Sequence, residues 1–339
     1  MHRTAVVILS FNGKKWLEKF LPNVLSNSKD DADIIVIDNG SSDDSVNFIH
    51  TTYKEDIKVI QLKKNWGFTG GYNKGLKDLN YDYFILLNSD VEVTPNWIKP
   101  IINQFEKDSS IAAVQPKIMS HSQKTTFEYA GACGGFIDKF GYPFCRGRVF
   151  DTVEQDINQY NKNTEIFWAS GACLFIRSKD FIDEGGFDQN FFAHMEEVDL
   201  CWRLKNKGKK IYFNSASVVY HVGGGTLTYN SAKKTYLNFR NSLFTIHKND
   251  SRNVFLIIII KLILDGIAGF RFILLGKPIL CLSILKAHFH YYKAIPRLHK
   301  FRKKQSKHDI KTLIGFHNKA IVLSYFLLNK KTFTKIISD

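Results

Sequence analysis

Four apolar residues, Phe84–Leu87, run directly into Asn88-Ser89-Asp90, three side chains that carry oxygen. A short uninterrupted apolar run is typical of a strand buried on both faces. Open α/β sheets bind ligands at the carboxyl ends of such strands, which is where the triplet lies. Hard cations such as Mg²⁺ and Mn²⁺ prefer oxygen donors, usually one or two carboxylates completed by substrate phosphates. The stretch favours a metal–nucleotide site, although an ordinary polar turn explains the triplet equally simply when it is taken alone.

The first third of the chain alternates segments of strand and helix character. Apolar runs predict strands at residues 5–10, 34–38, 58–62 and 83–88. Turn chemistry and spacing predict helices at 14–27, 42–53 and 71–79, and another after Thr94-Pro95, where proline suits a first helical turn. This order predicts an α/β fold with a doubly wound, mostly parallel mixed sheet. Later segments predict strands at 168–177 and 217–221, a helix at 196–207, and irregular or short antiparallel structure at 120–165.

The charge of the chain is concentrated at its C-terminal end. Residues 240–339 contain 19 Lys and Arg but 4 Asp and Glu, whereas residues 1–239 contain 28 of each kind. Such asymmetry indicates an anionic partner, either a membrane surface or nucleic acid. We therefore expect a catalytic domain at 1–240 and a basic helical tail at 241–339.

The tail is apolar at 254–264, 269–275 and 279–285, but Lys261, Asp265, Arg271 and Lys277 interrupt these runs. They are too short to cross a bilayer as a single helix. Amphipathic helices followed by the basic residues of 297–307 are typical of an interfacial membrane anchor, and they argue against nucleic acid. The alternative is a helical subdomain packed on the core or on a second copy of the chain. Five scattered cysteines and the absence of a leader-like N-terminus suit the cytoplasm.

Polar residues also follow the first two predicted strands. Ser10 and Asn12 follow the first, and Asp38 and Asn39 follow the second, where Asp38 can accept hydrogen bonds from a base or ribose. A turn and helix cap is the structural alternative for this second segment. Glycines cluster in Asn65–Gly75 and would let backbone N–H groups approach an anion. The segment matches neither G-x-G-x-x-G nor the P-loop pattern, which disfavours a Rossmann dehydrogenase or a P-loop NTPase.

Two later segments carry ionisable groups. Glu196, Glu197 and Asp199 place three carboxylates within four residues, which is unfavourable unless a cation or a function compensates. One of them could act as a general base toward a hydroxyl nucleophile, and a solvated helix start is the alternative. His221 ends an apolar strand before Gly223–Gly225, so it could be an imidazole ligand beside a mobile loop.

Taken together and in this order, these segments resemble family-2 glycosyltransferases of the GT-A fold, in the rhamnosyltransferase-like branch of bacterial surface-polysaccharide enzymes. The resemblance covers residues 4–245. It rests on the following motifs: V-V-I-L-S-F-N-G, I-V-I-D-N-G-S-S-D-D-S, N-W-G-F-T-G-G-Y-N-K-G, L-L-N-S-D-V-E-V, W-A-S-G-A-C-L-F-I-R, G-G-F-D-Q-N-F-F, M-E-E-V-D-L-C-W-R and Y-H-V-G-G-G-T. It implies a GT-A nucleotide-sugar-binding domain followed by a C-terminal helical extension.

The resemblance also implies roles for individual residues. Asn88-Ser89-Asp90 matches the family's D-x-D motif, with Asp90 as the main ligand of Mg²⁺ or Mn²⁺, Asn88 in place of the first Asp, and His221 as a further ligand. Glu197 matches the catalytic base, where the family usually has Asp, so Glu196 and Asp199 stay open as alternatives. The implied donor-binding residues are Ser10, Asn12, Asp38, Asn39, Asn65, Gly67, Gly70, Gly71, Asn73, Asn88 and Ser89. The implied acceptor-binding residues are Trp168, Gly171 and His194.

The function implied is an inverting, metal-dependent transfer of a hexose such as rhamnose from a nucleotide-diphosphate sugar. The acceptor is a hydroxyl of a glycan, free or linked to a polyprenyl diphosphate, in polysaccharide biosynthesis. Such an acceptor would place the enzyme at the inner face of the bacterial cytoplasmic membrane as a peripheral protein, with the tail on the anionic surface. The alternative enzyme class is a nucleotidyltransferase acting on sugar phosphates, and a homo-oligomer remains open.

Overall fold

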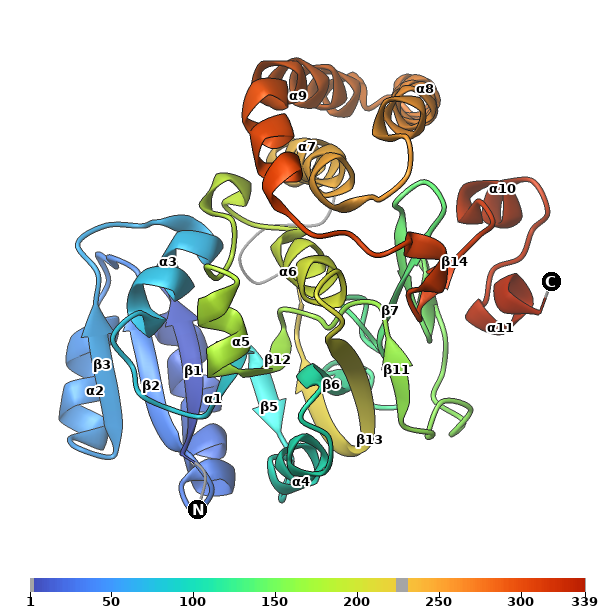
Figure 1. Ribbon diagram of the computed structural model, residues 1–339. Helices are drawn as coiled ribbons and strands as arrows, with labels where there is room; N and C mark the ends of the chain where they lie inside the picture. Colours follow the sequence, from blue (N-terminus) through green and yellow to red (C-terminus); the bar gives the residue numbers. More distant parts are fainter. Residues whose placement is uncertain (1–2, 224–230, 339) are drawn as a thin grey trace.

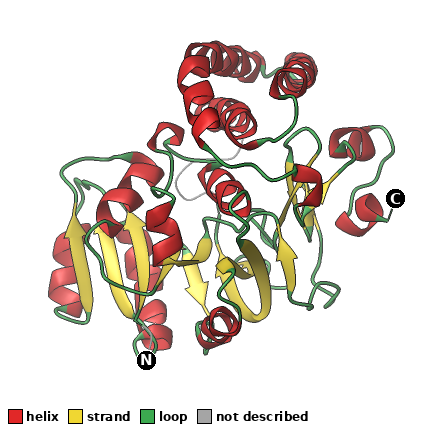
Figure 2. Cartoon of the chain, viewed as in Figure 1, coloured by secondary structure: helices red, strands yellow, loops and turns green. Residues whose placement is uncertain are grey.

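The computed structural model describes residues 3–223 and 231–338. Nine strands among them form one mixed sheet at the centre of the molecule, in the order β11-β13-β6-β12-β4-β1-β2-β3, with β5 paired to β13 (Figures 1 and 2). Its strands are β1 Thr4–Ser10, β2 Asp33–Asp38, β3 Ile57–Gln61, β4 Tyr83–Asn88, β5 Val91–Val93, β6 Ile111–Ser120, β11 Thr164–Ile166, β12 Cys173–Arg177 and β13 Lys210–His221.

Strands β3, β2, β1 and β4 are mutually parallel, as expected from the alternating segments. Successive side chains of a strand point to opposite faces. Val6 and Ile8 accordingly pack in one buried cluster with α1, while Ala5 and Val7 pack in another with α3. The sheet is thus covered on both faces, as a doubly wound fold requires. Its helices are α1 Lys14–Ser28, α2 Ser45–Tyr53, α3 Gly67–Leu76, α4 Lys99–Lys107, α5 Ser178–Asp183 and α6 Glu196–Lys205, with a 3₁₀ turn η1 at Gln189–Phe191.

Several element boundaries differ from those expected, three of them by more than a few residues or with a clear cause. No helix follows Pro95 directly, because Asn96 has a left-handed φ of 59° and turns the chain, so that α4 begins at Lys99 with Pro100 in its first turn. The strand expected at 168–177 begins only at Cys173. Strand β13 is longer than expected, and its pairing with β6 shifts register between Asn214 and Val218, a bulge that the local sequence does not announce.

The segment expected to form irregular or short antiparallel structure contains short antiparallel strands, which belong to a small second sheet in the order β10-β9-β8-β7-β14. Its strands are β7 Gly135–Asp138, β8 Pro143–Cys145, β9 Arg148–Val149, β10 Thr152–Val153 and β14 Phe316–His317. Strand β14 comes from the last thirty residues of the chain and pairs in parallel with β7, Phe316 opposite Ile137. The C-terminal region is therefore joined to the N-terminal domain by backbone pairing.

The C-terminal helices are α7 Ala232–Asn249, α8 Val254–Leu274, α9 Pro278–Lys304, α10 Ile321–Phe326 and α11 Phe333–Ile337, with a 3₁₀ turn η2 at Ile310–Thr312. In Figure 1, α7, α8 and α9 lie together above α6, whereas α10 and α11 lie at the right, beside β14. The boundary expected between residues 240 and 241 falls inside α7. Within the described residues, none of the helices combines the length and the hydropathy needed to cross a bilayer.

A buried ion network docks α7 on α6. Asp199 of α6 is completely buried and accepts from Lys248 Nζ at 2.9 Å, Arg203 Nε at 3.0 Å and Asn249 Nδ2 at 2.8 Å. Lys248 also pairs with Asp188, at 2.8 Å. Because every charge in this group has a partner, its burial is tolerated, whereas removing one partner would leave an uncompensated buried charge.

We predict that Asp199→Asn lowers the free energy of unfolding by about 3 kcal/mol, because Lys248 and Arg203 then lose a buried counter-charge. Chemical denaturation followed by circular dichroism measures this. Glu196→Gln is the matched control, since it makes the same change from carboxyl to amide on the same helix, at a buried side chain with no ion pair among the described residues. Equal stabilities of the two variants would contradict a structural role for Asp199.

Candidate active site

Three of the predicted donor-binding residues meet at one edge of the central sheet. Ser10 lies opposite Asp38 in the β1–β2 register, and Leu9 lies opposite Asn88 in the β1–β4 register. The side chain of Asp38 is buried, and its two oxygens lie 3.3 and 3.2 Å from the backbone N of Ser41. The hydroxyl of Ser10 is buried and has no hydrogen-bond partner among the described residues. Polar groups at the carboxyl ends of adjacent parallel strands are thus brought together as the sequence predicts.

The loops that follow β1 and β2 are tied to each other by Asn12. Its side-chain oxygen accepts from Ser42 N at 2.8 Å, and its backbone N donates to Ser41 Oγ at 2.9 Å. Asn12 has a φ of 49°, which asparagine tolerates better than most residues. Its amide therefore shapes this edge of the site by holding two loops together.

Asn39 plays a similar part between β2 and α3. Its Nδ2 donates to Asn65 Oδ1 at 3.2 Å and to Gly67 O at 3.0 Å, while its Oδ1 accepts from Trp66 N at 3.0 Å. The side chain is buried. Asn39 and Asn65 thus hold the turn before α3 in place.

The expectation that Asn65–Gly75 presents free N–H groups to an anion is wrong. Helix α3 begins at Gly67, so the glycines lie within it, and the first N–H groups already have acceptors. Gly67 N donates to Asn65 Oδ1 at 2.8 Å, and Phe68 N donates to Phe192 O at 2.8 Å. A Cβ added at Gly71 would come within 2.7 Å of Leu9, and one at Gly70 within 2.9 Å of Trp66. These glycines allow close packing of the helix.

The side-chain amide of Asn73 is hydrogen-bonded to the backbone of Phe187. Its Nδ2 donates to Phe187 O at 2.7 Å, and its Oδ1 accepts from Phe187 N at 2.9 Å. The structure therefore gives Asn73 a structural role as a link between α3 and the loop at 184–188.

Asp90 and His221 lie side by side because of strand pairing. His221, the last residue of β13, lies opposite Val91 of β5, which puts the neighbouring Asp90 against the imidazole. Nε2 of His221 is 3.2 Å from Asp90 Oδ1 and 3.3 Å from Asn88 Nδ2. On the other side of the ring, Nδ1 is 3.3 Å from Glu128 Oε2. Ser89 is half-buried between the two residues that face His221.

The charges in this group support one another. Burial disfavours the imidazolium of His221, but the hydrogen bonds and charges of Asp90 and Glu128 outweigh burial and raise its pKa to about 10. Burial likewise acts to raise the pKa of Asp90, but His221 more than offsets it and holds the pKa of this carboxyl below its usual value. Both residues are at least nine-tenths buried, so screening by solvent is weak.

The donor set fits a divalent ion that is completed by a ligand. A carboxylate oxygen and an imidazole nitrogen 3.2 Å apart are spaced as neighbouring ligands of an octahedral ion are. Glu128 against Nδ1 matches the usual arrangement in which a carboxylate orients a ligating histidine from behind. Within the described ranges, no group of three His, Cys, Asp or Glu is arranged to hold an ion by itself. The remaining ligands would have to come from a bound diphosphate or water.

The loop before α6 is strained and is held from α7. Phe192, His194 and Met195 all have φ near +68°, a region that non-glycine residues enter only when their surroundings enforce it. Asn241 Nδ2 lies 3.1, 2.9 and 2.7 Å from the carbonyl oxygens of Phe191, Ala193 and His194, respectively. Helix α7 thus fixes the loop that leads into Glu196 and Glu197.

Glu196 and Glu197 each have one carboxylate oxygen without a partner. Their Oε2 atoms are buried and make no hydrogen bond within residues 3–223 and 231–338. Burial, and then the charge of Glu197, raises the pKa of Glu196 well above its usual value. Burial also raises the pKa of Glu197, to about 7. Glu196 is 4% exposed, whereas Glu197 retains some solvent exposure, so Glu197 is the member of the pair that a substrate can reach. Asp199, the third candidate, is excluded by its ion pairs with Lys248 and Arg203.

The two halves of the site converge on one buried thiol. Burial raises the pKa of Cys145 in β8, and the charges of Glu128 and Glu197 both add to that rise. Carboxylates from the segment after β6 and from α6 therefore approach the same side chain. The charges of the two carboxylates therefore both act on the pKa of this one thiol.

The three residues expected to bind the acceptor lie in different environments. Trp168 is buried, donates from Nε1 to Phe136 O at 2.9 Å, and packs so tightly on Gly135 that a Cβ there would lie within 2.1 Å of the indole. It is therefore a core residue rather than a sugar platform. Gly171 faces the ring of Phe68, where a Cβ would be 3.4 Å away. His194 has an unpartnered Nε2, and burial, followed by the charge of Lys234, lowers its pKa to about 4.

Sequence reasoning missed Glu128, Arg240 and Asn241. Glu128 lies in the segment that we expected to form irregular loops or short antiparallel strands, and backbone bonds such as that from its N to Ile118 O of β6, 3.0 Å long, bring it to His221. Arg240 and Asn241 lie on either side of the expected domain boundary. No local motif marks any of the three. Of the expected glycine loop, Gly224 and Gly225 lie outside the described residues.

Known proteins resemble this chain in sequence. Residues 5–185 match the family model for glycosyl transferase family 2. An N-acetylglucosaminyl-diphospho-decaprenol L-rhamnosyltransferase of Mycobacterium tuberculosis is 25% identical over 240 residues, which cover 65% of this chain and 76% of that protein. The sequence match favours glycosyl transfer over nucleotidyl transfer.

Solved structures share the fold. GalNAc-T7, crystallised with UDP, GalNAc and Mn²⁺, has a TM-score of 0.58 at 17% identity, covering 73% of this chain and 48% of its own. Staphylococcus aureus TarS 1–349 in complex with UDP-GlcNAc has a TM-score of 0.55 at 15% identity, covering 88% of this chain and 83% of its own. The fold expected from the resemblance, GT-A with a helical C-terminal region, is confirmed. Since the family model covers more than half of the residues, the chain belongs to glycosyl transferase family 2.

Proposed function

We propose that the chain transfers a hexose, rhamnose being the first candidate, from a nucleotide-diphosphate sugar to a glycan hydroxyl with inversion at the anomeric carbon. The observation that carries this is Glu197, a partly accessible carboxylate with an unpartnered buried oxygen and a raised pKa, in a chain whose Asp90 and His221 are spaced as ligands of one divalent ion. The rhamnosyltransferase relative supports the choice of sugar and a polyprenyl-diphosphate-linked acceptor.

In this reaction the acceptor hydroxyl attacks the anomeric carbon while Glu197 takes its proton. Burial raises the pKa of Glu197 toward neutrality, which suits a base that must be ionised yet still attract a proton. The bond from the anomeric carbon to the diphosphate breaks as the new bond forms, so one displacement inverts the configuration. Asp38 and Ser10 lie where they can bind the nucleoside, and the strained loop at 192–195 positions the base. Mg²⁺ or Mn²⁺ held by Asp90 and His221 would neutralise negative charge on the leaving nucleotide.

We predict that Glu197→Gln lowers kcat by about 10²- to 10⁴-fold with little change in donor affinity, because it removes only the proton acceptor. In the unaltered enzyme, kcat/KM should fall as the pH drops through about 7, since protonated Glu197 cannot accept a proton. Nucleotide release measured between pH 5 and 9 tests both. Glu196→Gln is the control, and a larger loss in that variant would transfer the role of base to Glu196.

We also predict that Asp90→Ala and removal of divalent ions with EDTA each abolish transfer, whereas Asn88→Asp keeps it. Asp90 is the carboxylate that faces His221, and Asn88 is a neutral neighbour 3.3 Å from the ring. Nucleotide release with a panel of UDP-, dTDP- and GDP-sugars, with and without added Mn²⁺, measures this and identifies the donor. Full activity of Asp90→Ala would refute the assignment.

We propose further that α8 and α9 bind an anionic membrane surface. Helix α8 has its charged side chains on the face that packs against the protein. Lys261 Nζ lies 2.6 Å from Asp265 Oδ1, and both residues are buried. Its outer face is apolar, with Ile259, Ile263 and Ile267 between 56% and 62% exposed. The large exposed hydrophobic residues of the two helices recur every three or four positions, as on one helix face. They are Phe255, Leu256, Ile259, Ile263, Ile267, Phe270, Ile273, Leu274, Leu275, Ile279, Leu282, Leu285, Phe289 and Tyr292.

Charge complementarity favours an anionic bilayer as the occupant of this face. Arg271, Lys277 and Lys286 are exposed beside the apolar residues, while the single acidic residue of 251–304, Asp265, is buried. A broad apolar face with a basic border is typical of helices that lie in the membrane interface. The basic segment at 297–307 is a weaker candidate than we expected. Arg302 donates to His247 O and Arg252 O, and Lys307 Nζ donates to Arg302 O, so part of this segment is turned inward.

We predict that the combined variant Ile263→Ser, Ile267→Ser and Phe270→Ser lowers binding to phosphatidylglycerol-containing vesicles about tenfold or more, because each change removes exposed apolar surface. Flotation assays measure this. Lys300→Gln, Lys303→Gln and Lys304→Gln, combined, form the control and should change binding much less. Flotation equal to that of the unaltered chain would contradict the proposal, and a lipid-free dimer broken by the serine substitutions would assign the face to a second copy.

A further inference from the structure

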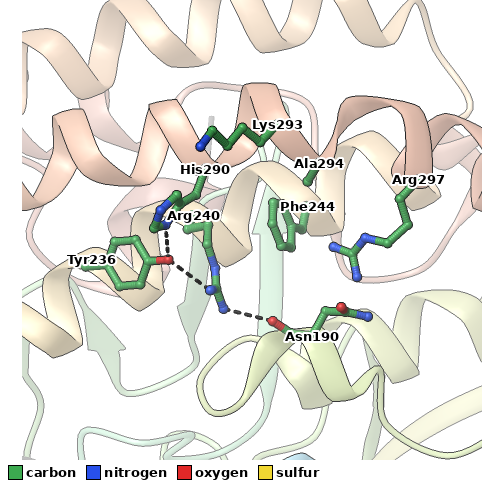
Figure 3. A pocket seen from close by; sticks show the side chains of 8 residues that line it. All are labelled: Asn190, Tyr236, Arg240, Phe244, His290, Lys293, Ala294 and Arg297. Atoms are coloured by element: carbon green, nitrogen blue, oxygen red, sulfur yellow. Dashed lines mark hydrogen bonds between the residues drawn. The ribbon is translucent and has the colours of Figure 1, made fainter.

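A cavity lies between α7, α9 and the η1 turn, lined by none of the carboxylates described above. Its volume is about 370 Å³, within the range of small-ligand pockets. Figure 3 shows Arg240 and Arg297 extending from the two helices toward Asn190, on either side of Phe244. The lining residues are Asn190, Tyr236, Arg240, Phe244, His290, Lys293, Ala294 and Arg297.

The cavity is strongly basic, and two of its cations are available. Arg240 is committed, because it donates to Asn190 O and Phe191 O at 2.9 Å and to Tyr236 Oη at 3.0 Å. By contrast, neither Lys293 nor Arg297 has a hydrogen-bond acceptor in the described part of the chain. Arg297 lies 4.0 Å from Asp188.

The nearest acid does not neutralise this group. Asp188 is already paired with Lys248 at 2.8 Å. Burial lowers the pKa of His290, and the charges of Lys286, Arg240 and Lys293 lower it further. Available guanidinium and ammonium groups around a cavity favour a ligand with more than one negative charge, and guanidinium geometry suits phosphate oxygens.

The cavity opens onto the apolar face of α9. Leu282, Lys286, Phe289 and Lys293 recur at intervals of four, three and four residues and so share one face of the helix. Lys293 Nζ lies 4.3 Å from the centre of the Phe289 ring, which is 54% exposed. An anionic group in the cavity would therefore have an exposed hydrocarbon surface beside it.

The cavity also shares a wall with the active site. Arg240 binds the carbonyls of Asn190 and Phe191, while the adjacent Asn241 binds those of Phe191, Ala193 and His194. These residues form the strained loop that leads into Glu196 and Glu197. A ligand held at Lys293 and Arg297 would lie beside Arg240, which binds the start of this loop segment.

We propose that this cavity binds the diphosphate of an isoprenoid diphosphate, whose hydrocarbon chain lies along the exposed face of α9. The ligand is the lipid carrier of the sugar acceptor, so the proposal rests on the glycosyltransferase function above. Lys293 and Arg297 bind the diphosphate oxygens. Phe289, Leu285 and Leu282 contact the chain. The arrangement would hold the acceptor by its lipid end. It would present the acceptor sugar to the loop at 192–195, which leads into α6 and its base, Glu197.

The test measures binding of geranylgeranyl diphosphate to the full chain by isothermal titration calorimetry. Lys293→Gln with Arg297→Gln should weaken binding about tenfold or more, because two charge-assisted contacts are lost. Lys300→Gln with Lys303→Gln is the matched control, since it removes the same charge from exposed positions of the same helix, and it should weaken binding less than about twofold. Equal weakening by both pairs would show general charge attraction and overturn the site.

Two further ligands test whether the cavity recognises a prenyl diphosphate, a free diphosphate or a phospholipid headgroup. Inorganic pyrophosphate should bind at least about tenfold more weakly than the prenyl compound, because it lacks the chain. Equal affinities would overturn the role of the apolar face. Phosphatidylglycerol vesicles should bind the cavity variant and the control alike, and a selective loss for the cavity variant would make the cavity a phospholipid headgroup site instead.

The proposed glycosyltransferase function and the proposed lipid site can be tested independently. Hydrolysis of a nucleotide sugar by the unaltered chain with Mn²⁺ needs no lipid, so its absence across the whole donor panel would reject glycosyl transfer and leave the binding result standing. If the chain transfers sugar to a prenyl-diphosphate acceptor, the cavity variant should raise the KM for that acceptor more than it lowers kcat. An unchanged KM would overturn the cavity as the acceptor site.

Discussion

The buried carboxylate of Asp199 is the contact on which the arrangement of the site depends. It binds Lys248 and Asn249 of α7 and Arg203 of its own helix, all out of contact with solvent. A buried ion pair is not by itself strong evidence for stability, but each charge here would be uncompensated without the others. The network therefore makes α6 and α7 one unit. Because Asn241 of α7 also holds the strained loop before Glu196, the same docking sets the position of the base candidates.

The opposite part of the site depends on strand pairing. Asp90 and His221 are 131 positions apart, yet the β5–β13 pairing puts them 3.2 Å apart. Glu128 then closes the group from the other side of the imidazole. Each of these residues sits on a strand or directly beside one, where the backbone ladder restricts movement. A site that must bind a diphosphate and place a base gains from such rigid support.

The C-terminal hundred residues have two roles, which their basic and apolar composition does not distinguish. Helix α7 and strand β14 brace the catalytic domain, whereas α8 and α9 turn an apolar face outward. Removing the region after residue 239 would delete Lys248 and Asn241 together with the exposed hairpin. Individual substitutions on the outer face are therefore the proper means of separating membrane binding from stability.

Local sequence patterns are enough to predict the alternation of strands and helices, the parallel order of the first four strands, and the meeting of Ser10, Asp38 and Asn88 at one edge. These follow from local periodicity and from the rule that parallel strands share an end. The choice between the carboxylates depends instead on long-range contacts, because Glu197 and Asp199 look alike in sequence. In the fold, Asp199 is paired with Lys248 of α7, whereas Glu197 keeps an unpartnered oxygen. The tertiary structure also decided that Trp168 is a core residue and that the glycines of α3 serve packing, since both depend on neighbours far away in the chain.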